Sequence, residues 1–200
     1  MEKDHVAHSC DFLVIGGSAG SLEVLFKLLP LLRDDLPFPV GLVLHRRNSA
    51  DSSLTGLLAS KTLNPTREVE DKDPVLPGTI YLAPADYHLL IERDRTFSLD
   101  YSEKINFSRP SIDVTFESAA EVFGEGLVAI LLSGANEDGT AGLTAVKKVH
   151  GTIVVQDPGT AQMPFMPHHA MTHSHVDHVL NLLEMATFIN ALRGHPGNDR

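Results

Sequence analysis

The sequence contains no tryptophan and only one cysteine, Cys10, among its 200 residues. A single thiol cannot form a disulfide within the chain, which excludes the cysteine framework of small secreted domains and fits a reducing compartment. The first residues carry charges of both signs and lack the basic start and the apolar stretch of a signal peptide. We therefore expect a cytoplasmic protein.

Long apolar runs and an excess of positive charge are also missing. Glycine, proline or a charged residue interrupts every run before the ~18 apolar residues that a transmembrane helix needs, so we expect no membrane insertion. Lys and Arg number 16 against 26 Asp and Glu, which gives a formal net charge of −10. A polyanion would meet net repulsion from such a chain, and we expect no nucleic-acid partner.

The residues that are present suffice for one compact domain. Hydrophobic residues make up 42% of the chain and charged residues 21%, which is typical of a globular protein. The length is also about that of one domain. Residues 1–10 and 194–200 are polar and show no periodicity, so we expect flexible ends on either side of a single domain at 11–193.

Short apolar runs alternate with stretches of helical periodicity through most of this domain. The candidate buried strands lie at 12–15, 40–44, 127–132 and 152–155. The candidate helices lie at 22–32, 51–63, 112–123, 143–149 and 182–192. Between 67 and 99, proline and glycine separate three short runs that we interpret as mainly antiparallel strands. The pattern predicts a doubly wound α/β fold: a mainly parallel sheet, helices on both faces, and a short antiparallel section mid-chain.

Reactive side chains follow three of the predicted parallel strands. Ser18 comes after the first, His45 directly after the second, and Glu137 and Asp138 lie in the loop after the strand at 127–132. Ligands of open α/β sheets bind outside the carboxyl ends of the strands, where these residues would meet. A hydroxyl, an imidazole and a carboxylate are therefore expected at one edge of the sheet.

Ser18 lies in Gly16-x-Ser18-x-Gly20, which fits the nucleophile elbow of serine hydrolases. Glycines flank the serine in that motif because side chains would clash in the sharp strand-to-helix turn. The alternative is a glycine turn in which Ser18 caps the helix or holds a phosphate. A dinucleotide fingerprint is not matched, because Ser18 stands where its second glycine belongs.

His45 and Asp138 also have alternative interpretations. His45 taken alone could be a half-buried histidine at a strand end, but neighbouring strand ends can bring it to the serine as a general base. Asp138 could instead cap a helix or form a turn before Gly139. On chemistry alone, Glu137 could serve as well as Asp138.

A group of histidines and a pair of arginines complete the candidates. Five histidines cluster late in the chain: His168, His169, His173, His175 and His178. A metal site there is the less favoured interpretation, because no H-E-x-x-H pattern is present. We expect Arg46 and Arg47 at the solvated surface, with recognition of a carboxylate near the site as the alternative.

The chain order Ser18, His45, Asp138 differs from the Ser, Asp, His order of α/β-hydrolases. Three further stretches accompany the serine turn: 76–84 (LPGTIYLAP), 109–116 (RPSIDVTF) and 134–142 (GANEDGTAG). With these motifs in this order, the sequence resembles the catalytic domain of the CheB chemotaxis methylesterases, or protein-glutamate methylesterases. The resemblance runs from about Asp11 to Leu192.

This resemblance implies a doubly wound α/β fold and a catalytic triad of Ser18, His45 and Asp138, and it favours Asp138 over Glu137. It implies hydrolysis of glutamate γ-methyl esters on the cytoplasmic domain of chemoreceptors, with release of methanol, and often deamidation of receptor glutamines. The backbone N–H groups of Ala19, by elbow geometry, and of Ala135, by the resemblance, would form the oxyanion hole. No metal or organic cofactor is expected.

The sequence also departs from the family pattern. Arg46-Arg47-Asn48 replaces a Met-Pro-Pro-like segment, and Gly134-Ala135-Asn136 replaces Gly-Met-Gly. Family members usually carry a receiver domain before this one, so we expect any regulatory domain on another chain. The alternatives are a different ester substrate, another signalling protein as partner, or a non-catalytic signalling or phosphate-binding module.

Overall fold

A computed structural model describes residues 9–46 and 53–194 of the chain. The strands are β1 (Ser9–Cys10), β2 (Phe12–Gly17), β3 (Val40–Leu44), β4 (Thr66–Glu68), β5 (Ile80–Leu82), β6 (His88–Ile91), β7 (Phe97–Asp100), β8 (Leu127–Leu131), β9 (Thr152–Gln156), β10 (His178–Leu180) and β11 (Arg193–Gly194). The helices are α1 (Ser21–Leu28), α2 (Ser53–Ala59), α3 (Ile112–Phe123), α4 (Thr140–Lys148), α5 (Phe165–His173) and α6 (Leu182–Ala191). Short 3-10 turns follow α1, α3 and β9.

Seven parallel strands form the central sheet, in the order β10-β9-β8-β2-β3-β5-β4. From β2 the chain builds outward through β3 and β5 on one side, and then returns through β8, β9 and β10 on the other. The fold is therefore doubly wound, as predicted, and its order reverses beside β2. Such a reversal opens a crevice at the carboxyl ends of the central strands.

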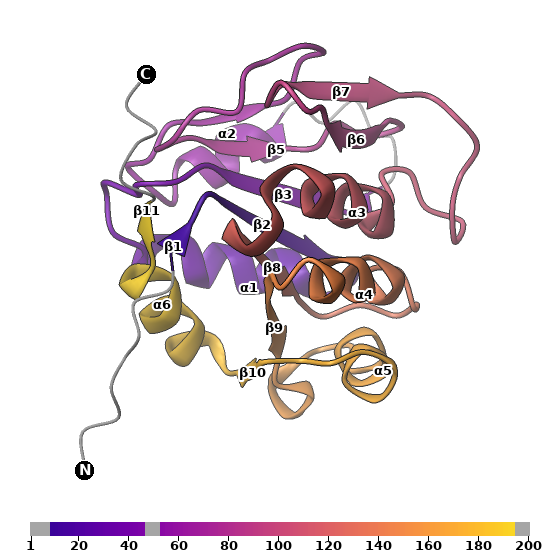
Figure 1. Ribbon diagram of the computed structural model, residues 1–200. Helices are drawn as coiled ribbons and strands as arrows, with labels where there is room; N and C mark the ends of the chain where they lie inside the picture. The colour runs from indigo at the N-terminus through magenta and orange to yellow at the C-terminus, as the bar shows by residue number, and fades with distance from the viewer. Residues whose placement is uncertain (1–8, 47–52, 195–200) are drawn as a thin grey trace.

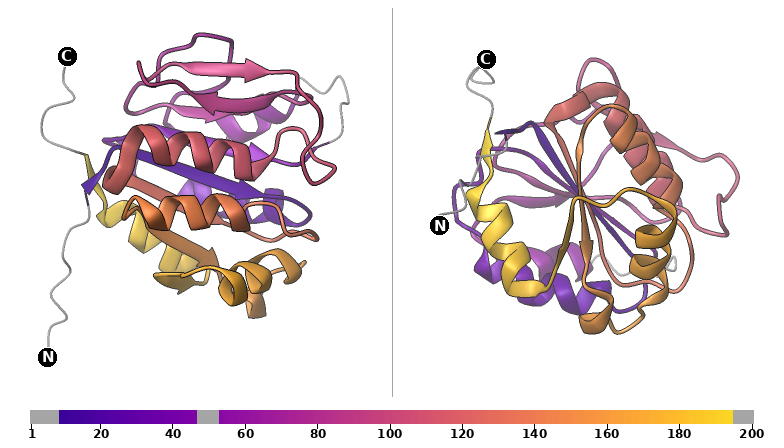
Figure 2. Two further views of the ribbon diagram at one scale, coloured as in Figure 1. Left: turned by 45° about the vertical axis from the view of Figure 1, so that its right-hand side comes forward. Right: turned by 60° about the horizontal axis from the view of Figure 1, so that its bottom comes forward.

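Helices cover both faces of the sheet (Figures 1 and 2). α1 and α6 lie against one face, and α3, α4 and α5 lie against the other. β2 supplies side chains to both cores: Leu13 and Ile15 belong to one hydrophobic cluster, and Phe12 and Val14 to the other. Each such fully buried side chain contributes about 1.5–3 kcal/mol, which explains why the central strands are continuous apolar runs.

The predicted helix at 112–123 is confirmed as α3. Its apolar stripe, including Ile112 and Phe116, is buried against the sheet. The helix ends at Gly124, whose φ of 54° is a conformation that glycine adopts with little cost. This placement matters for the site, because the first turn of α3 lies at the carboxyl edge of β2 and β8.

The middle section differs in part from the prediction of mainly antiparallel strands. β6 and β7 do form an antiparallel pair. β4 and β5, however, are parallel to each other, and β5 joins β3 in the central sheet. Strand direction here is set by packing on the edge of the sheet, which short apolar runs do not encode.

Two short strands reach just outside the predicted domain bounds of 11 and 193. β1, at Ser9–Cys10, pairs in parallel with β11, at Arg193–Gly194, and the Cys10 side chain is fully buried. The described fold therefore includes residues 9, 10 and 194, which lie outside the predicted bounds. Residues 1–8 and 195–200 lie outside the described residues.

Among the described residues, no helix is long and apolar enough to cross a membrane.

Candidate active site

Two neighbouring strand ends bring Ser18 and His45 to the same edge of the sheet. Gly17 of β2 is paired with Leu44 of β3, and each candidate residue follows its strand directly. The His45 N–H donates a hydrogen bond to the Gly17 carbonyl oxygen at 3.1 Å. Adjacent strands lie about 4.8 Å apart, so the two side chains start from neighbouring points.

Asp138 is fully buried at the amino terminus of α3. Its Oδ2 accepts a hydrogen bond from the Ile112 N–H at 2.7 Å, and its Oδ1 accepts one from the Asp113 N–H at 3.1 Å. The Ser111 hydroxyl donates to Oδ1 at 2.9 Å. Asp138 therefore caps a helix, as the alternative interpretation allowed, although that helix is α3 rather than the one that follows it in the chain.

The surroundings of Asp138 keep it ionised. Burial alone would raise the pKa of this carboxyl group. The hydrogen bonds from His45 and from the Ile112 and Asp113 N–H groups outweigh burial, so the pKa lies below its ordinary value. A carboxylate held in this way can orient an imidazole and stabilise its protonated form.

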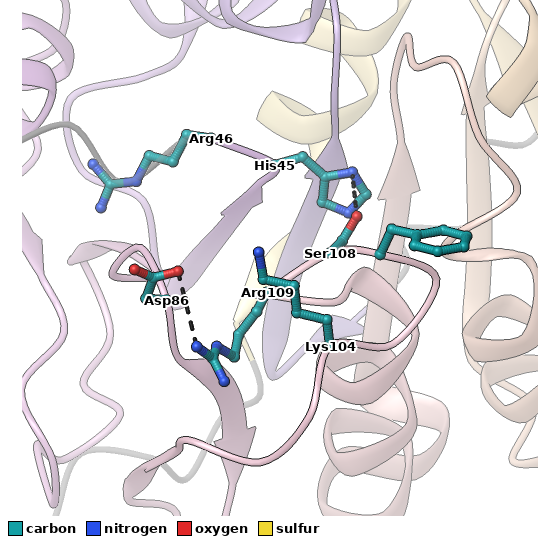
Figure 3. Close-up of a pocket in the computed structure, with 7 residues that line it drawn as sticks. His45, Arg46, Asp86, Lys104, Ser108 and Arg109 are labelled. Carbon is teal, nitrogen blue, oxygen red and sulfur yellow. Dashed lines mark hydrogen bonds and ion pairs between the residues drawn. The ribbon is translucent and has the colours of Figure 1, made fainter.

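One ring nitrogen of His45 contacts Asp138, and the other contacts Ser108, a serine other than Ser18. Its Nε2 lies 2.7 Å from Asp138 Oδ2. Its Nδ1 lies 3.3 Å from the Ser108 hydroxyl (Figure 3). An ionised carboxylate can only accept, so Nε2 carries the hydrogen of the neutral ring and Nδ1 is the basic nitrogen. The nitrogen available to take a proton therefore faces away from Asp138.

Ser18 lies in a turn that requires its glycines. A Cβ at Gly16 would be 2.5 Å from the Ile112 side chain, and Gly20 has a φ of 84°. Gly20 is the N-cap of α1, and that helix has no side-chain cap, so Ser18 is not its cap. Close packing at Gly16 also lets the start of α3 approach β2.

The structure joins His45 to Asp138 but does not join Ser18 to His45. Within residues 9–46 and 53–194, no hydrogen bond links the Ser18 hydroxyl to the imidazole. Ser18 is partly exposed, and its own N–H donates to the Ser133 carbonyl oxygen at 2.9 Å. Its role as the nucleophile stays a prediction.

The two predicted oxyanion-hole residues are both exposed. In the described part of the chain, neither the Ala19 N–H nor the Ala135 N–H donates a hydrogen bond to a protein acceptor. The flanking backbone is fixed, because the Gly134 N–H donates to the Met163 carbonyl oxygen and the Met166 N–H donates to Gly134, both at 3.0 Å. Ala19 and Ala135 therefore both offer free N–H groups, and hydrogen bonds fix the backbone next to Ala135.

Glu137, the other carboxylate considered from the sequence, points elsewhere. It is well exposed and lies 3.8 Å from His169 rather than beside His45. The backbone turn explains the difference. The Asp138 N–H donates a hydrogen bond to Asn136 Oδ1, and this turn directs the Asp138 carboxylate inward. Only one of the two adjacent acidic side chains reaches the imidazole.

Sequence reasoning missed three residues near this pair: Ser108, Ser111 and Asp113. Asp113 is buried, and its Oδ1 accepts a hydrogen bond from the Gly142 N–H of α4 at 2.7 Å. Burial and the nearby charge of Asp138 raise its pKa to about 7. Ser111 and Asp113 lie in the stretch 109–116, which indicated a likeness to other sequences but no contacts. Ser108 lies outside it.

The late histidines form a different kind of cluster. His169 and His173 stack on α5 with ring centroids 4.0 Å apart, and the His169 ring lies 3.0 Å from the Thr140 hydroxyl. Among the residues that the structure describes, no group of three or more His, Cys, Asp or Glu side chains could hold a metal ion.

A cavity of about 550 Å³ opens beside His45 and Ser108. Arg46 lines it, and its side chain is only 18% exposed. Its Nη2 donates to Glu68 at 2.6 Å and to the Ala83 carbonyl oxygen at 3.2 Å. The expectation of a solvated side chain was therefore wrong for Arg46, because these acceptors hold it against the protein. Arg47 lies outside the described residues.

The fold and site define a doubly wound α/β protein with a buried Asp–His pair at its carboxyl edge. Residues 13–189 match the family model for CheB methylesterase. The chain therefore belongs to the CheB methylesterase family, whose members are carboxylic ester hydrolases.

Comparisons of the chain with individual proteins support the same family. A Leptospira interrogans protein is 42% identical over 174 residues, which cover 87% of this chain and 90% of that protein. A Thermotoga maritima protein-glutamate methylesterase/protein-glutamine glutaminase is 35% identical over 87% of this chain and 52% of its own length. The crystal structure of the Thermotoga maritima CheB methylesterase catalytic domain has a TM-score of 0.87 and 33% identity, covering 92% of this chain and 100% of that one.

Proposed function

We propose that this protein hydrolyses glutamate γ-methyl esters on the cytoplasmic domain of methylated chemoreceptors and releases methanol. Ser18 is the nucleophile, His45 the general base and acid, and Asp138 the residue that orients His45. The observation that carries the proposal is the buried Asp138–His45 contact of 2.7 Å, one strand away from the serine turn. The proposal places the enzyme in the cytoplasm, where that receptor domain lies.

In the first half of the reaction, the Ser18 hydroxyl oxygen attacks the ester carbonyl carbon while its proton passes to His45 Nδ1. The Nε2–H of the resulting imidazolium stays on the Asp138 carboxylate. The Ala19 and Ala135 N–H groups, which are free in the described structure, stabilise the oxyanion. The C–O bond to the methoxy group then breaks, and His45 returns the proton to give methanol and an acyl-enzyme.

In the second half, a water molecule attacks the acyl carbon and gives its proton to the same Nδ1. Collapse of the second tetrahedral intermediate breaks the bond to Ser18, which takes the proton back. The product is a glutamate side chain. With ammonia as the leaving group, the same steps convert glutamine to glutamate, the second activity in the name of the Thermotoga relative.

The Ser108 hydroxyl occupies the place beside His45 Nδ1 that the Ser18 hydroxyl must reach in the reaction. The Ser108 hydroxyl lies 3.3 Å from Nδ1 and equally far from the Asn106 carbonyl oxygen, to which it donates. These are long contacts for a hydroxyl donor. For Ser18 to act as the nucleophile, its hydroxyl must replace that of Ser108 beside Nδ1.

The test is methanol release from membranes that carry methylated receptor, compared for the wild type and Ser18→Ala. The proposal predicts release that requires Ser18. A fluorophosphonate probe separates the alternatives. Ser18-dependent labelling without methanol release would indicate another ester or another signalling partner. Absence of labelling together with saturable nucleotide binding would indicate a non-catalytic module.

A further inference from the structure

The cavity beside His45 carries positive charge in a chain whose net charge is −10. Arg46, Lys104 and Arg109 line it, whereas Asp86 is its one acidic lining residue among those described. Figure 3 shows these side chains arranged around a common space, with His45 and Ser108 at one side. Cations gathered beside the site of an acidic protein favour an anionic group there.

Arg46 has donors that its present contacts do not use. Its Nη2 serves Glu68 and Ala83, but its Nε is buried without a hydrogen-bond partner in the described structure. A buried guanidinium that is only partly paired costs free energy, which an added acceptor would recover.

Arg109 is held in place at the floor of the cavity. Its guanidinium stacks on the Tyr101 ring at 3.9 Å and donates to the Ser102 carbonyl oxygen at 2.7 Å. Its Nη2 forms an ion pair with Asp86 at 4.0 Å, and its Nε is buried without a hydrogen-bond partner among the described residues. A fixed cation of this kind binds an anion with little loss of side-chain entropy.

Lys104, the third cation of the cavity, and the aromatic residue Phe107 lie on the loop that precedes α3. Lys104 is exposed and forms no ion pair with any described acidic residue, and its amino group points into the cavity (Figure 3). Phe107, which also lines the cavity, is 98% exposed at a φ of 61°. An apolar ring in water beside three cations fits a peptide better than a small inorganic anion.

We propose that this cavity is a carboxylate subsite that selects acidic peptide segments. It would bind a free carboxylate near the methylated glutamate, while Phe107 contacts an apolar part of the same segment. The inference rests on the proposed function and specifies its substrate class. Arg46 would be a residue that determines specificity.

The test uses two peptides that each carry one glutamate γ-methyl ester, flanked by glutamates in one and by glutamines in the other. At low ionic strength we expect kcat/KM to be at least about tenfold higher for the acidic peptide, and Arg46→Gln to remove most of that preference. Lys104→Gln should reduce it as well. Arg33→Gln, an identical change at an exposed pair with Asp35, is the matched control and should leave the ratio unchanged.

Glu68→Gln gives a prediction of opposite sign. It removes the negative charge that pairs with Arg46 Nη2, so the guanidinium becomes freer to bind the peptide and the preference should rise. A purely structural role for the Arg46–Glu68 pair would not produce such a rise. Phe107→Ala should raise KM for both peptides without changing their ratio.

Binding separates this inference from the proposed function. If the wild type releases no methanol from either peptide, the proposed function fails. Fluorescence anisotropy with Ser18→Ala and labelled peptides then decides the subsite, and about tenfold tighter binding of the acidic peptide supports it. The subsite would be overturned if the two peptides had equal kcat/KM and bound equally well. It would also be overturned if Arg46→Gln left the preference for the acidic peptide unchanged. Loss of the preference in millimolar phosphate at constant ionic strength would indicate a phosphate site and also overturn it.

Discussion

Asp138 has two roles at once, as partner of His45 and as cap of α3. The carboxylate receives three hydrogen bonds from the start of that helix and its preceding serine, and it meets the imidazole with the same group. The helix dipole and the buried donors fix both its charge and its position. The pair is thereby orientated before any substrate arrives.

The three residues expected to react could be named from the sequence, because each follows an apolar strand and a glycine turn surrounds one of them. The sequence alone left Glu137 and Asp138 open, since both are carboxylates in one loop. It could not reveal Ser108, because Ser108 lies in the loop before α3 whereas His45 follows β3. Side-chain proximity across 63 residues of chain has no local signal.

Ser18 and Ser108 provide a matched pair of variants at the residue scale. Ser18→Ala should lower kcat by several orders of magnitude, because it removes the attacking oxygen. Ser108→Ala removes the hydroxyl that now lies beside His45 Nδ1 and should change kcat by less than about tenfold. Steady-state methanol release measures both. A greater loss for Ser108→Ala would exchange the roles of the two serines.

Asp138→Asn tests the orienting carboxylate. The amide can still accept from α3, but it cannot stabilise the imidazolium, so kcat/KM should fall by about 10²–10⁴-fold. Thermal unfolding should also shift downward by the equivalent of about 1–2 kcal/mol, because a charged helix cap is lost. Glu137→Gln, the adjacent exposed carboxylate, is the control. Equal effects of the two variants would refute the assignment of Asp138.

At the scale of elements, the central strands and main helices could be predicted because their apolar patterns match their burial. The helix α5 and the strand β10 were not predicted as such. α5 has few fully buried residues, among them Met166 and Ala170, and β10 is a three-residue edge strand. Such elements form where the sheet and α4 offer a surface, so tertiary contacts rather than local pattern determine them.

Asp113 connects the first turns of α3 and α4, and its protonation should govern how stability changes with pH. Its pKa is raised from the ordinary 3.8 to about 7, first by burial. The stabilising contribution of the protonated form is thus complete below the ordinary value and is lost as pH rises through about 7. Asp138, with a lowered pKa, has the opposite dependence, and its contribution is lost only as the pH falls below the ordinary aspartate range.

Asp113→Asn should therefore gain stability relative to the wild type as pH rises. Urea unfolding from about pH 5 to about pH 8 should show the difference in unfolding free energy shifting by about 1–2 kcal/mol in favour of the variant. Subtracting the wild-type curve at each pH removes the contributions of all other titrating groups. A difference that stays constant with pH would mean that Asp113 is ionised throughout.

At the scale of the whole molecule, the alternation of strands and helices was sufficient to predict a doubly wound sheet. The pairing of the two chain ends was not predictable, because β1 and β11 are two residues each and carry no periodicity. Their pairing nevertheless encloses Cys10, which lies in the core with residues of α6 and β2. The single cysteine thereby becomes a probe of global unfolding.

Burial raises the pKa of the Cys10 thiol, so the native protein should react very slowly with a disulfide reagent such as DTNB. Reaction should accelerate with denaturant in step with the loss of far-UV circular dichroism. Rapid stoichiometric labelling without denaturant would mean that the β1–β11 pair opens far below the global unfolding free energy.

The most direct test of the central claim is to identify the atom that reacts. The protein is treated with a fluorophosphonate, digested, and the modified peptide is located by mass spectrometry. We predict a single adduct on Ser18 that is absent after His45→Ala, because the imidazole must accept the serine proton. An adduct on Ser108, or equal labelling without His45, would contradict the account.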